Sequence, residues 1–481
     1  MGRDRFNAHC REGQELSISS TNNAAIAADG AFGAADSGVA KKEIRLEAPG
    51  TGFMDTWKAM GPGIAAAMTG IGASHIMHAP TAGARFGYDL LWVILAAYII
   101  KYCAFEFAHR YTMVKGETII NAYHRVGTWP LWFMIFQGLA NTVGIAGRAL
   151  GCAALMWAAF PFMPMEAWAV TILVGTVVIL WLGSYSAVEG ICKLLIIIFA
   201  VSCFVAFALQ APPPAEYLSR LLPTLPPVGA MLLFGAMFGY FPTTLEVAPM
   251  QSNWAVDKKA GMVKVNEMRA QGHTVHMDPD YMKKSLILFK RDMNISYIIS
   301  MLSGMIFLIV GAAVLNPMGL VPKGSEMGTT IARIYTDTFG AWIFPVIIAG
   351  GVAALFSTVF TYFDGQARIF EECAVRLKKD WDNPRMRKLL YRGMQVLWLV
   401  AGIAVVFGLP EPIFVVQVAS VMALVFSPVL FWLTIKAVKD NFTSDFEREL
   451  LPTKFQFAWA WAGTGSLVLL TLYVLYYQFL G

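Results

Sequence analysis

Charged residues are scarce in this sequence. Only 14% of its 481 residues are charged, whereas 57% are hydrophobic. Soluble domains carry about 25% charged residues, so this composition argues against a water-soluble protein. The hydrophobic residues also gather in blocks of about twenty, the length at which an α-helix crosses a bilayer. The composition therefore predicts an all-α, polytopic membrane protein.

Several functional motifs are also missing. The six cysteines are scattered and show no CxxC spacing, which argues against a disulfide framework or a zinc site. There is no phosphate-binding loop, no nucleophile elbow and no set of metal ligands at catalytic spacing. Aromatic and basic residues do not interleave as they do on nucleic-acid-binding surfaces. We therefore expect no enzyme activity, no cofactor, no resident metal and no nucleic-acid partner.

Apolar blocks predict eleven transmembrane helices, with boundaries good to a few residues. They lie near residues 59–78, 89–109, 129–158, 166–184, 190–210, 228–250, 292–315, 340–365, 392–408, 412–435 and 456–479.

Basic residues set the expected orientation. The densest clusters run from Lys258 to Arg291 and from Arg368 to Arg392, both in loops on the same side of the predicted bundle. Because cytoplasmic loops carry an excess of Lys and Arg, the N-terminus is predicted to be cytoplasmic and Gly481 external. We expect an integral protein of a bacterial-type inner membrane, with the lipid bilayer as a partner.

Two of the predicted spans are interrupted. The first contains the stretch 69–75, which is rich in Gly and Ser, and the sixth contains Gly235, Gly239 and the stretch 241–244 around Pro242. Broken helices at matching positions in two repeats indicate the central site of a transporter. Glycines also allow close helix packing, which is the alternative explanation.

These positions divide the chain into four parts. Residues 1–45, rich in Ala, Gly, Ser and Asn, are predicted to be a disordered cytoplasmic tail. Residues 46–225 and 226–440 are predicted to form two five-helix repeats, and 441–481 to add one C-terminal transmembrane helix. The polar connector at 253–290 is expected to be solvated, although a short interfacial helix at Met262–Met268 is possible.

The chain resembles the Nramp metal-ion transporters, which have a LeuT-type fold, and this resemblance implies that the two five-helix repeats are inverted relative to each other. The matching residues are Gly61-Pro62-Gly63 through His75, Ala82–Tyr88, Leu90–Val93, Phe241-Pro242-Thr243, Ser357-Thr358 and Gly365-Gln366. The resemblance covers roughly residues 59–440. It implies a secondary transporter that works by alternating access.

The metal-binding motifs of that family are replaced. Its Asp-Pro-Gly-Asn motif in helix 1 falls on Gly72, Ala73, Ser74 and His75. Its Met-Pro-His motif in helix 6 starts at Phe241. Its acidic pair in helix 3 falls on Gly138 and Asn141. A dehydrated divalent cation in a low-dielectric cavity needs anionic ligands. Manganese or iron transport is therefore doubtful, and a hydrated ion such as magnesium remains the alternative.

The altered helix break favours an anion. Small residues at 70–74 would leave N–H groups free where helix 1 restarts, and a helix N-terminus attracts negative charge. Aromatic residues of helix 6, including Phe238, would form an apolar wall. The predicted substrate-binding residues are Thr69, Gly70, Gly72, Ser74, His75, Tyr240, Phe241, Thr243, Thr244 and Glu246. In the alternative interpretation the glycines only relieve packing and His75 is a satisfied core histidine.

Ionisable residues inside membrane spans are candidates for function. They are Lys101, Glu106, Arg148, Glu246 and Asp364. Glu246 would contact a substrate amine or titrate as a gate, and Arg148 would face the cavity or pair with a carboxylate. Glu106 and Asp364 lie near cytoplasmic ends, where a structural role is expected. His78 is assigned to packing, with a His75–His78–Glu246 metal site as a minor alternative.

A coupling-ion site is also predicted. Ala354, Ser357 and Thr358 in helix 8 have the spacing of the sodium site in sodium-coupled relatives, and Thr69 would join them from helix 1. The hydroxyls would equally well bond the preceding turn of their own helix.

Three hypotheses follow. The first is a symporter of a small organic solute, with a carboxylate on the solute and sodium as coupling cation. The second is a divalent-metal transporter with a modified site, and the third is a receptor that has lost transport. The sequence does not fix the oligomeric state, and we expect a monomer.

Overall fold

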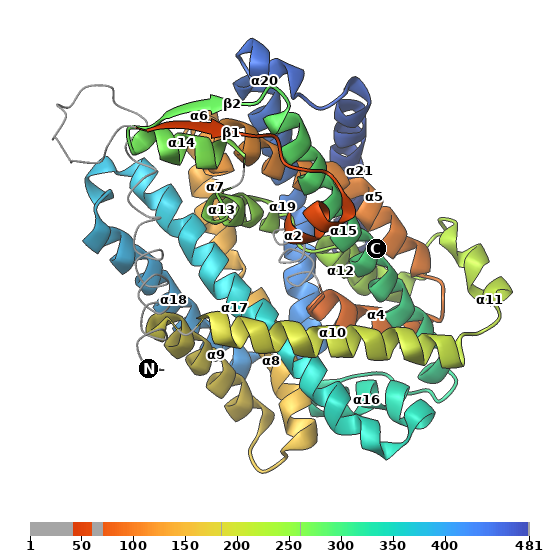
Figure 1. Ribbon diagram of the computed structural model, residues 1–481. Helices are drawn as coiled ribbons and strands as arrows, with labels where there is room; N and C mark the ends of the chain where they lie inside the picture. Colours follow the sequence, from red (N-terminus) through yellow and green to blue (C-terminus); the bar gives the residue numbers. More distant parts are fainter. Residues whose placement is uncertain (1–41, 60–70, 184, 260, 480–481) are drawn as a thin grey trace, which may run out of the picture.

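The structure is a computed structural model, which describes residues 42–59, 71–183, 185–259 and 261–479. It is a bundle of long helices (Figure 1). Only helices and closed barrels satisfy all backbone hydrogen-bonding groups within lipid, so apolar segments of this length form helices. The predicted all-α membrane fold is confirmed.

Within the described ranges, eight helical segments are long and apolar enough to cross a bilayer. They are α5 (Leu91–Lys115), α7 with α8 (Trp129–Ala140 and Thr142–Ala159), α9 (Met165–Leu182), α15 (Tyr281–Val314), α17 (Phe344–Leu377), α18 (Pro384–Gly408), α19 (Pro412–Asn441) and α21 (Lys454–Phe479). A ninth candidate lies in α10 (Tyr185–Gln210), which bends by 115° into the segment that holds α11 (Pro214–Leu218). All nine correspond to predicted spans.

The other two predicted spans are the interrupted ones. Span 228–250 is divided into α12 (Met231–Tyr240) and α13 (Val247–Asp257), and residues 241–246 between them are not helical. The predicted break in helix 6 is thus confirmed. Span 59–78 is described only from Ile71, where a bend precedes the π-helical turn η1 (Ser74–His78) and α4 (Ala79–Phe86). Thr69 and Gly70 lie outside the described residues.

Close backbone contacts join the interrupted spans to the rest of the bundle. α4 packs along α15, and α12 packs along α19. A Cβ atom on Gly83 of α4 would lie 2.3 Å from the carbonyl oxygen of Leu308, and one on Gly239 of α12 would lie 1.8 Å from that of Ser420. Small residues allow such approaches between membrane helices. Packing therefore explains part of the glycine pattern.

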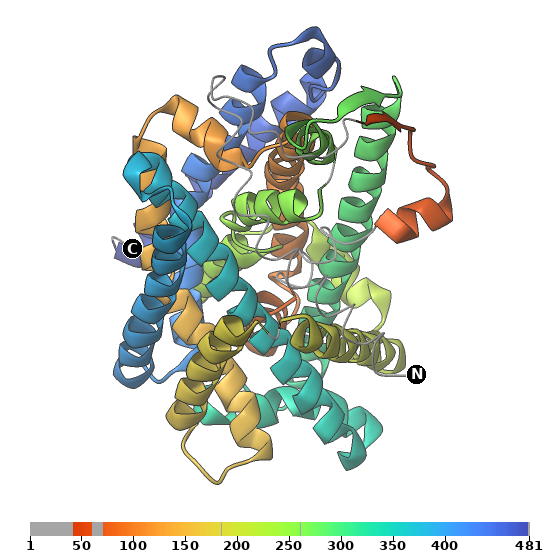
Figure 2. The ribbon, with the colours of Figure 1, turned by 60° about the vertical axis from the view of Figure 1, so that its left-hand side comes forward.

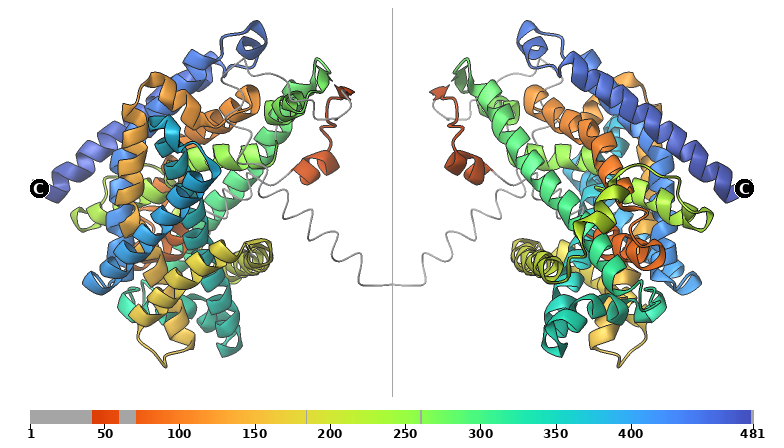
Figure 3. Two further views of the ribbon diagram at one scale, coloured as in Figure 1. Left: turned by 90° about the vertical axis from the view of Figure 1, so that its left-hand side faces the viewer. Right: turned by 90° about the vertical axis from the view of Figure 1, so that its right-hand side faces the viewer.

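Connecting segments gather at the two ends of the bundle (Figures 1 and 2). One end carries α6 (Ile119–Val126), α14 (Met262–Ala270) and α20 (Asp445–Glu449), and the opposite end carries α16 (Met327–Phe339). In Figure 3, α21 runs along one edge of the bundle, and the C-terminus lies at its outer end.

A short parallel strand pair was not predicted. β1 (Glu43–Leu46) pairs with β2 (Thr274–Met277), with Ile44 opposite Val275. The expected tail boundary at residue 45 falls inside β1, so ordered chain begins by residue 42. The connector between α13 and α15 is also more structured than a solvated loop, because it contains α14 as well as β2. Residues 1–41 of the predicted tail lie outside the described residues.

The contact at Gly239 gives a stability prediction. Gly239→Ala would drive a methyl group into the Ser420 carbonyl, which cannot move without shifting α19. We expect a loss of about 1–3 kcal/mol, typical of overpacking, measured as a lower melting temperature of the purified protein.

Gly465→Ala in α21 is the control, because its Cβ would meet no atom within 4 Å. That change should be neutral or slightly stabilising, since alanine is the better helix former. Equal melting temperatures for the two variants would contradict the packing at Gly239.

Candidate functional site

The break in helix 6 is bridged by a buried lysine. Lys101 of α5 is fully buried, and its ammonium group donates to the carbonyl oxygens of Gly239, at 2.8 Å, and Thr243, at 3.3 Å. The last carbonyl groups of a helix have no partner within the helix, and its C-terminal end carries partial negative charge. Lys101 therefore both caps α12 and neutralises its negative end.

Glu246 lies at the other side of the break. It is 2% exposed and occupies the N-cap position of α13, where a negative charge is favourable. Its carboxylate accepts a hydrogen bond from the Gln137 side-chain amide of α7. Nearby, the hydroxyl groups of Thr244 and Tyr362 are hydrogen-bonded to each other, which ties the break to α17.

Arg148 of α8 is held between aromatic rings. Its guanidinium carbon lies 3.8 Å from the centre of the Tyr362 ring and 4.8 Å from that of Tyr240. The side chain is 1% exposed. Its Nη1 atom has no hydrogen-bond partner among the described residues. Aromatic faces stabilise a guanidinium group but leave its in-plane N–H donors available.

Other polar groups converge on the same point. A Cβ atom on Gly144 would lie within 3 Å of Asn141 Oδ1, the Tyr240 hydroxyl and Arg148 Nη1. The His78 ring lies 5.6 Å from the Tyr240 ring, and neither of its nitrogen atoms has a hydrogen-bond partner within the described ranges. Buried polar groups are nearly always paired, so unpaired ones mark a place where a ligand or water binds. We call His78, Asn141, Arg148, Tyr240 and Glu246 the central polar cluster.

Ser74 and His75 face a different direction. His75 Nδ1 lies 2.8 Å from the Ser74 hydroxyl, and Nε2 lies 2.8 Å from the Ser300 carbonyl oxygen of α15. Because a carbonyl only accepts, Nε2 carries the proton. The ring packs 5.0 Å from that of Phe241. His75 thus joins η1 to α15, a geometry that favours the core-histidine interpretation over a role in binding substrate.

Helix 8 meets the break in helix 1. A Cβ atom on Gly72 would lie 2.2 Å from Thr358 Oγ1. The Thr358 hydroxyl donates to the Ala354 carbonyl at 2.9 Å, and the Ser357 carbonyl accepts from Thr361. Thr358 of the predicted coupling-ion site is therefore close to Gly72, but its hydroxyl bond lies within α17.

The structure brings only some of the predicted site residues together. Tyr240 and Glu246 belong to the central polar cluster, whereas Phe241 packs on the His75 side of the break. Thr243 contributes its carbonyl to Lys101, and Thr244 bonds Tyr362. Glu106 and Asp364, expected to be structural, form ion pairs with Arg110 and Arg368 of their own helices.

Sequence reasoning gave no binding role to Asn141 and assigned His78 to packing. Gln137, Asn141 and Arg148 are spaced by four and seven residues, so they share one face of an otherwise apolar helix. A polar face inside a membrane helix signals function. The role of His78 could not be deduced, because it depends on which helix faces η1.

Within the described residues, no group of three or more His, Cys, Asp or Glu side chains is placed to hold a metal ion. The alternative site of His75, His78 and Glu246 does not form.

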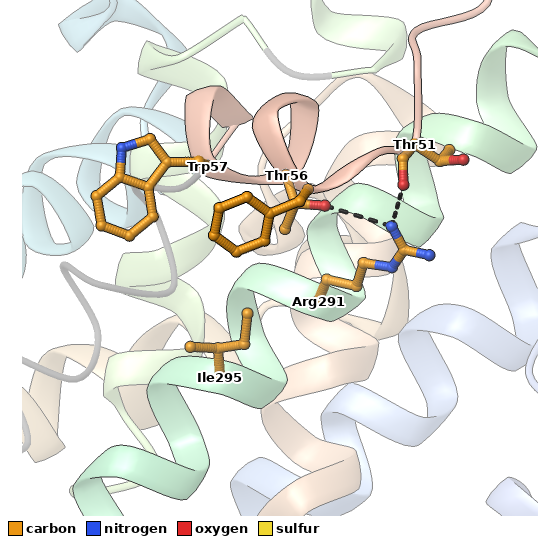
Figure 4. A pocket seen from close by; sticks show the side chains of 6 residues that line it. Thr51, Thr56, Trp57, Arg291 and Ile295 are labelled. Carbon is orange, nitrogen blue, oxygen red and sulfur yellow. Dashed lines mark hydrogen bonds between the residues drawn. The ribbon is translucent and has the colours of Figure 1, made fainter.

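A separate groove lies between α2 (Phe53–Ala59) and α15 (Figure 4). It measures about 550 Å³ and is lined by Thr51, Phe53, Thr56, Trp57, Arg291 and Ile295. Arg291 donates to the Thr51 carbonyl and, at 3.3 Å, to the Thr56 hydroxyl. None of the predicted site residues lines this groove.

The fold and the buried charges define a class of protein. A membrane bundle with a helix split near a cluster of buried ionisable groups is typical of secondary transporters. A family model described as natural resistance-associated macrophage protein-like matches residues 63–477, and the chain belongs to this Nramp family. Its members are transporters, which confirms the expectation that the chain is not an enzyme.

Individual relatives are distant. An uncharacterized protein of Pasteurella multocida, PM0681, is 26% identical over 394 residues, which is 79% of this chain and 84% of that protein. The divalent metal cation transporter MntH of Mycobacterium tuberculosis is 25% identical over 314 residues, 63% of this chain and 67% of that protein.

Solved structures show the same fold. A mutant of the Eremococcus coleocola manganese transporter aligns with a TM-score of 0.63 at 15% identity, covering 90% of this chain and 89% of that one. MhsT in complex with L-phenylalanine aligns with a TM-score of 0.54 at 15% identity, covering 87% and 98%. The predicted LeuT-type fold is thereby confirmed.

The charge arrangement gives a second prediction. Glu246→Gln keeps the shape of the side chain but removes the buried carboxylate from the break in helix 6, where Lys101 and Arg148 are also buried. Removing one partner from buried charges costs about 3–5 kcal/mol, so the melting temperature should fall clearly. Combining Glu246→Gln with Arg148→Met should cost less than the sum of the two single changes.

Glu216→Gln in α11 provides the control, since Glu216 is exposed and its charge is solvated. A Glu246→Gln variant as stable as this control would show that Glu246 does not balance the buried cations.

Proposed function

We propose that the protein is a secondary active transporter, working by alternating access, for a small organic solute that carries a carboxylate. The observation that carries this proposal is the charge at the break in helix 6. Lys101 and Arg148 bring two buried cationic side chains there, and Glu246 brings one carboxylate. A bound carboxylate would add a negative charge beside these two cationic side chains, whereas a divalent cation would add two more positive charges.

Arg148 is the proposed carboxylate ligand. Tyr240 and Tyr362 hold its guanidinium plane, and its Nη1 atom points to the same place as Asn141 and Tyr240. An arginine held in this way is suited to carboxylate binding, since its donors match the two oxygens. N–H groups at the restart of helix 1, from Gly70 to Ser74, would supply further donors. The ring of Tyr240 would contact the apolar part of the solute.

Sodium is the proposed coupling ion. Ala354, Ser357 and Thr358 would bind it together with Thr69, through neutral oxygen atoms suited to a hard monovalent cation. Thr358 packs directly against Gly72, so an ion there would link helix 8 to the restart of helix 1. Symport would follow, since the solute and the ion would both contact the restart of helix 1.

The proposed setting is a bacterial-type inner membrane, with a cytoplasmic N-terminus and a monomeric protein. The clustering of the predicted cytoplasmic connectors at one end of the bundle supports this orientation (Figure 1).

Arg148→Met tests the proposal. Small mono- and dicarboxylates are screened for their ability to stabilise the purified protein. For each carboxylate, the corresponding primary amide is tested as the uncharged control. We expect some carboxylates, but not their amides, to raise the melting temperature of the parent protein by mass action. Loss of a buried charge pair should weaken binding by about 2–5 kcal/mol, or roughly thirtyfold and more.

Arg125→Met is the matched control, because Arg125 pairs with Glu117 at a partly exposed site outside the bundle core. Gly72→Asp, which restores the family's acidic residue, should also abolish transport, but any side chain there meets Thr358. Arg148→Met is therefore the better test, because a loss of transport in Gly72→Asp could also come from the clash with Thr358. Stabilisation by amides as strong as that by carboxylates would refute the proposal.

The second candidate is a divalent-metal transporter with a modified site. It is favoured by the relatives named divalent metal cation transporter MntH and by the structural likeness to a manganese transporter. Flux of Mg²⁺, Mn²⁺ and Ca²⁺ into proteoliposomes tests it. Saturable flux of any of these ions would support this candidate over the carboxylate transporter.

A further inference from the structure

Lys101 occupies a position that suits a free cation. Its ammonium group lies against two backbone carbonyl oxygens, those of Gly239 in the last turn of α12 and Thr243 in the non-helical segment that follows. Carbonyl oxygens of unwound segments and the C-terminal ends of half-helices coordinate the driving cation in broken-helix transporters. Hard oxygen ligands of this kind do not require a particular cation.

A charged group is not needed merely to satisfy these carbonyls. A neutral donor such as a glutamine amide would form the same hydrogen bonds without the large cost of burying an ammonium ion. The positive charge has a counterpart in the negative end of the α12 dipole, and the buried carboxylate of Glu246 lies at the other side of the break. The surroundings are therefore built for a monovalent cation.

We propose that Lys101 is a tethered cation that permanently fills the cation-binding end of the split helix 6. In this structure the ammonium group occupies the site, and its covalent link to α5 keeps it from diffusing away. No mobile ion binds at this end of α12, so any coupling ion is restricted to the helix 1 and helix 8 side. Lys101 is thus a specificity-determining residue that excludes metal ions. This inference does not depend on which solute is transported.

The test removes the tether and offers free cations. Lys101→Ala is purified, and its melting temperature is measured in NaCl, KCl, MgCl₂ and MnCl₂, with choline chloride as the control for ionic strength. Both the parent and the variant carry Thr358→Val, which removes a hydroxyl from the other proposed ion site. We expect at least one cation to raise the melting temperature of the Lys101→Ala protein by several degrees and in a saturable way, with no such rise in the parent.

Methylammonium chloride provides a second measurement if Lys101→Ala folds poorly, because it supplies the missing amine. It should restore the yield of folded protein in a concentration-dependent manner. Lys115→Ala is the matched control on the same helix, since Lys115 pairs with Glu447 at the end of α5. It should gain no response to cations.

Two results would overturn the proposal. One is a Lys101→Ala protein that is folded and responds to cations no more than the parent. The other is a Lys101→Ala protein that neither methylammonium nor any of the four salts restores, since Lys101 would then serve only as a structural anchor. Neither result bears on the carboxylate screen, so the two proposals fail separately.

Discussion

Burying charge in a low-dielectric membrane interior is the constraint on which this structure depends. Splitting helix 6 exposes backbone carbonyl and N–H groups at mid-bundle, where water is scarce, and each must find a partner. Here the protein itself supplies a cationic donor for the carbonyl end and places a carboxylate next to the N–H end. Lys101 binds the carbonyl end of the break, and Glu246 lies at the N–H end. Arg148, seated on two aromatic rings, adds a second positive charge.

Helix spans followed from the sequence because they depend on local composition. Apolar length located nine spans, although α15, α17 and α18 extend 8 to 12 residues beyond the predicted blocks at one end. Pro242 with its neighbouring glycines indicated where α12 would end. Each of these features is a property of a single segment. The strand pair β1–β2 could not be deduced in this way, because it joins segments more than 200 residues apart through backbone bonds that carry little sequence signal.

The candidate site was predicted less completely. The break in helix 6 and the buried residues Arg148 and Glu246 were recognised, but the partners of each side chain depend on how the helices are rotated. His75 and His78 lie three residues apart, yet one is bonded to α15 and the other faces Tyr240. Periodicity alone does not say which of two histidines faces the centre of a bundle. The long reach of Lys101 from α5 to the break is likewise a tertiary property.

The chain keeps the Nramp fold, and we propose that its central site has a chemistry other than metal binding. The family match and the close helix contacts at Gly83 and Gly239 describe the helix bundle, not the binding site. In the proposed function, the buried cations favour a carboxylate over a cation as cargo.

Equilibrium binding of Mn²⁺ to the purified parent protein, followed by the loss of the free-ion signal in electron paramagnetic resonance, tests this account most directly. We expect no saturable binding, because the protein's own cations already balance the helix break. Stoichiometric binding at micromolar Mn²⁺ would contradict it.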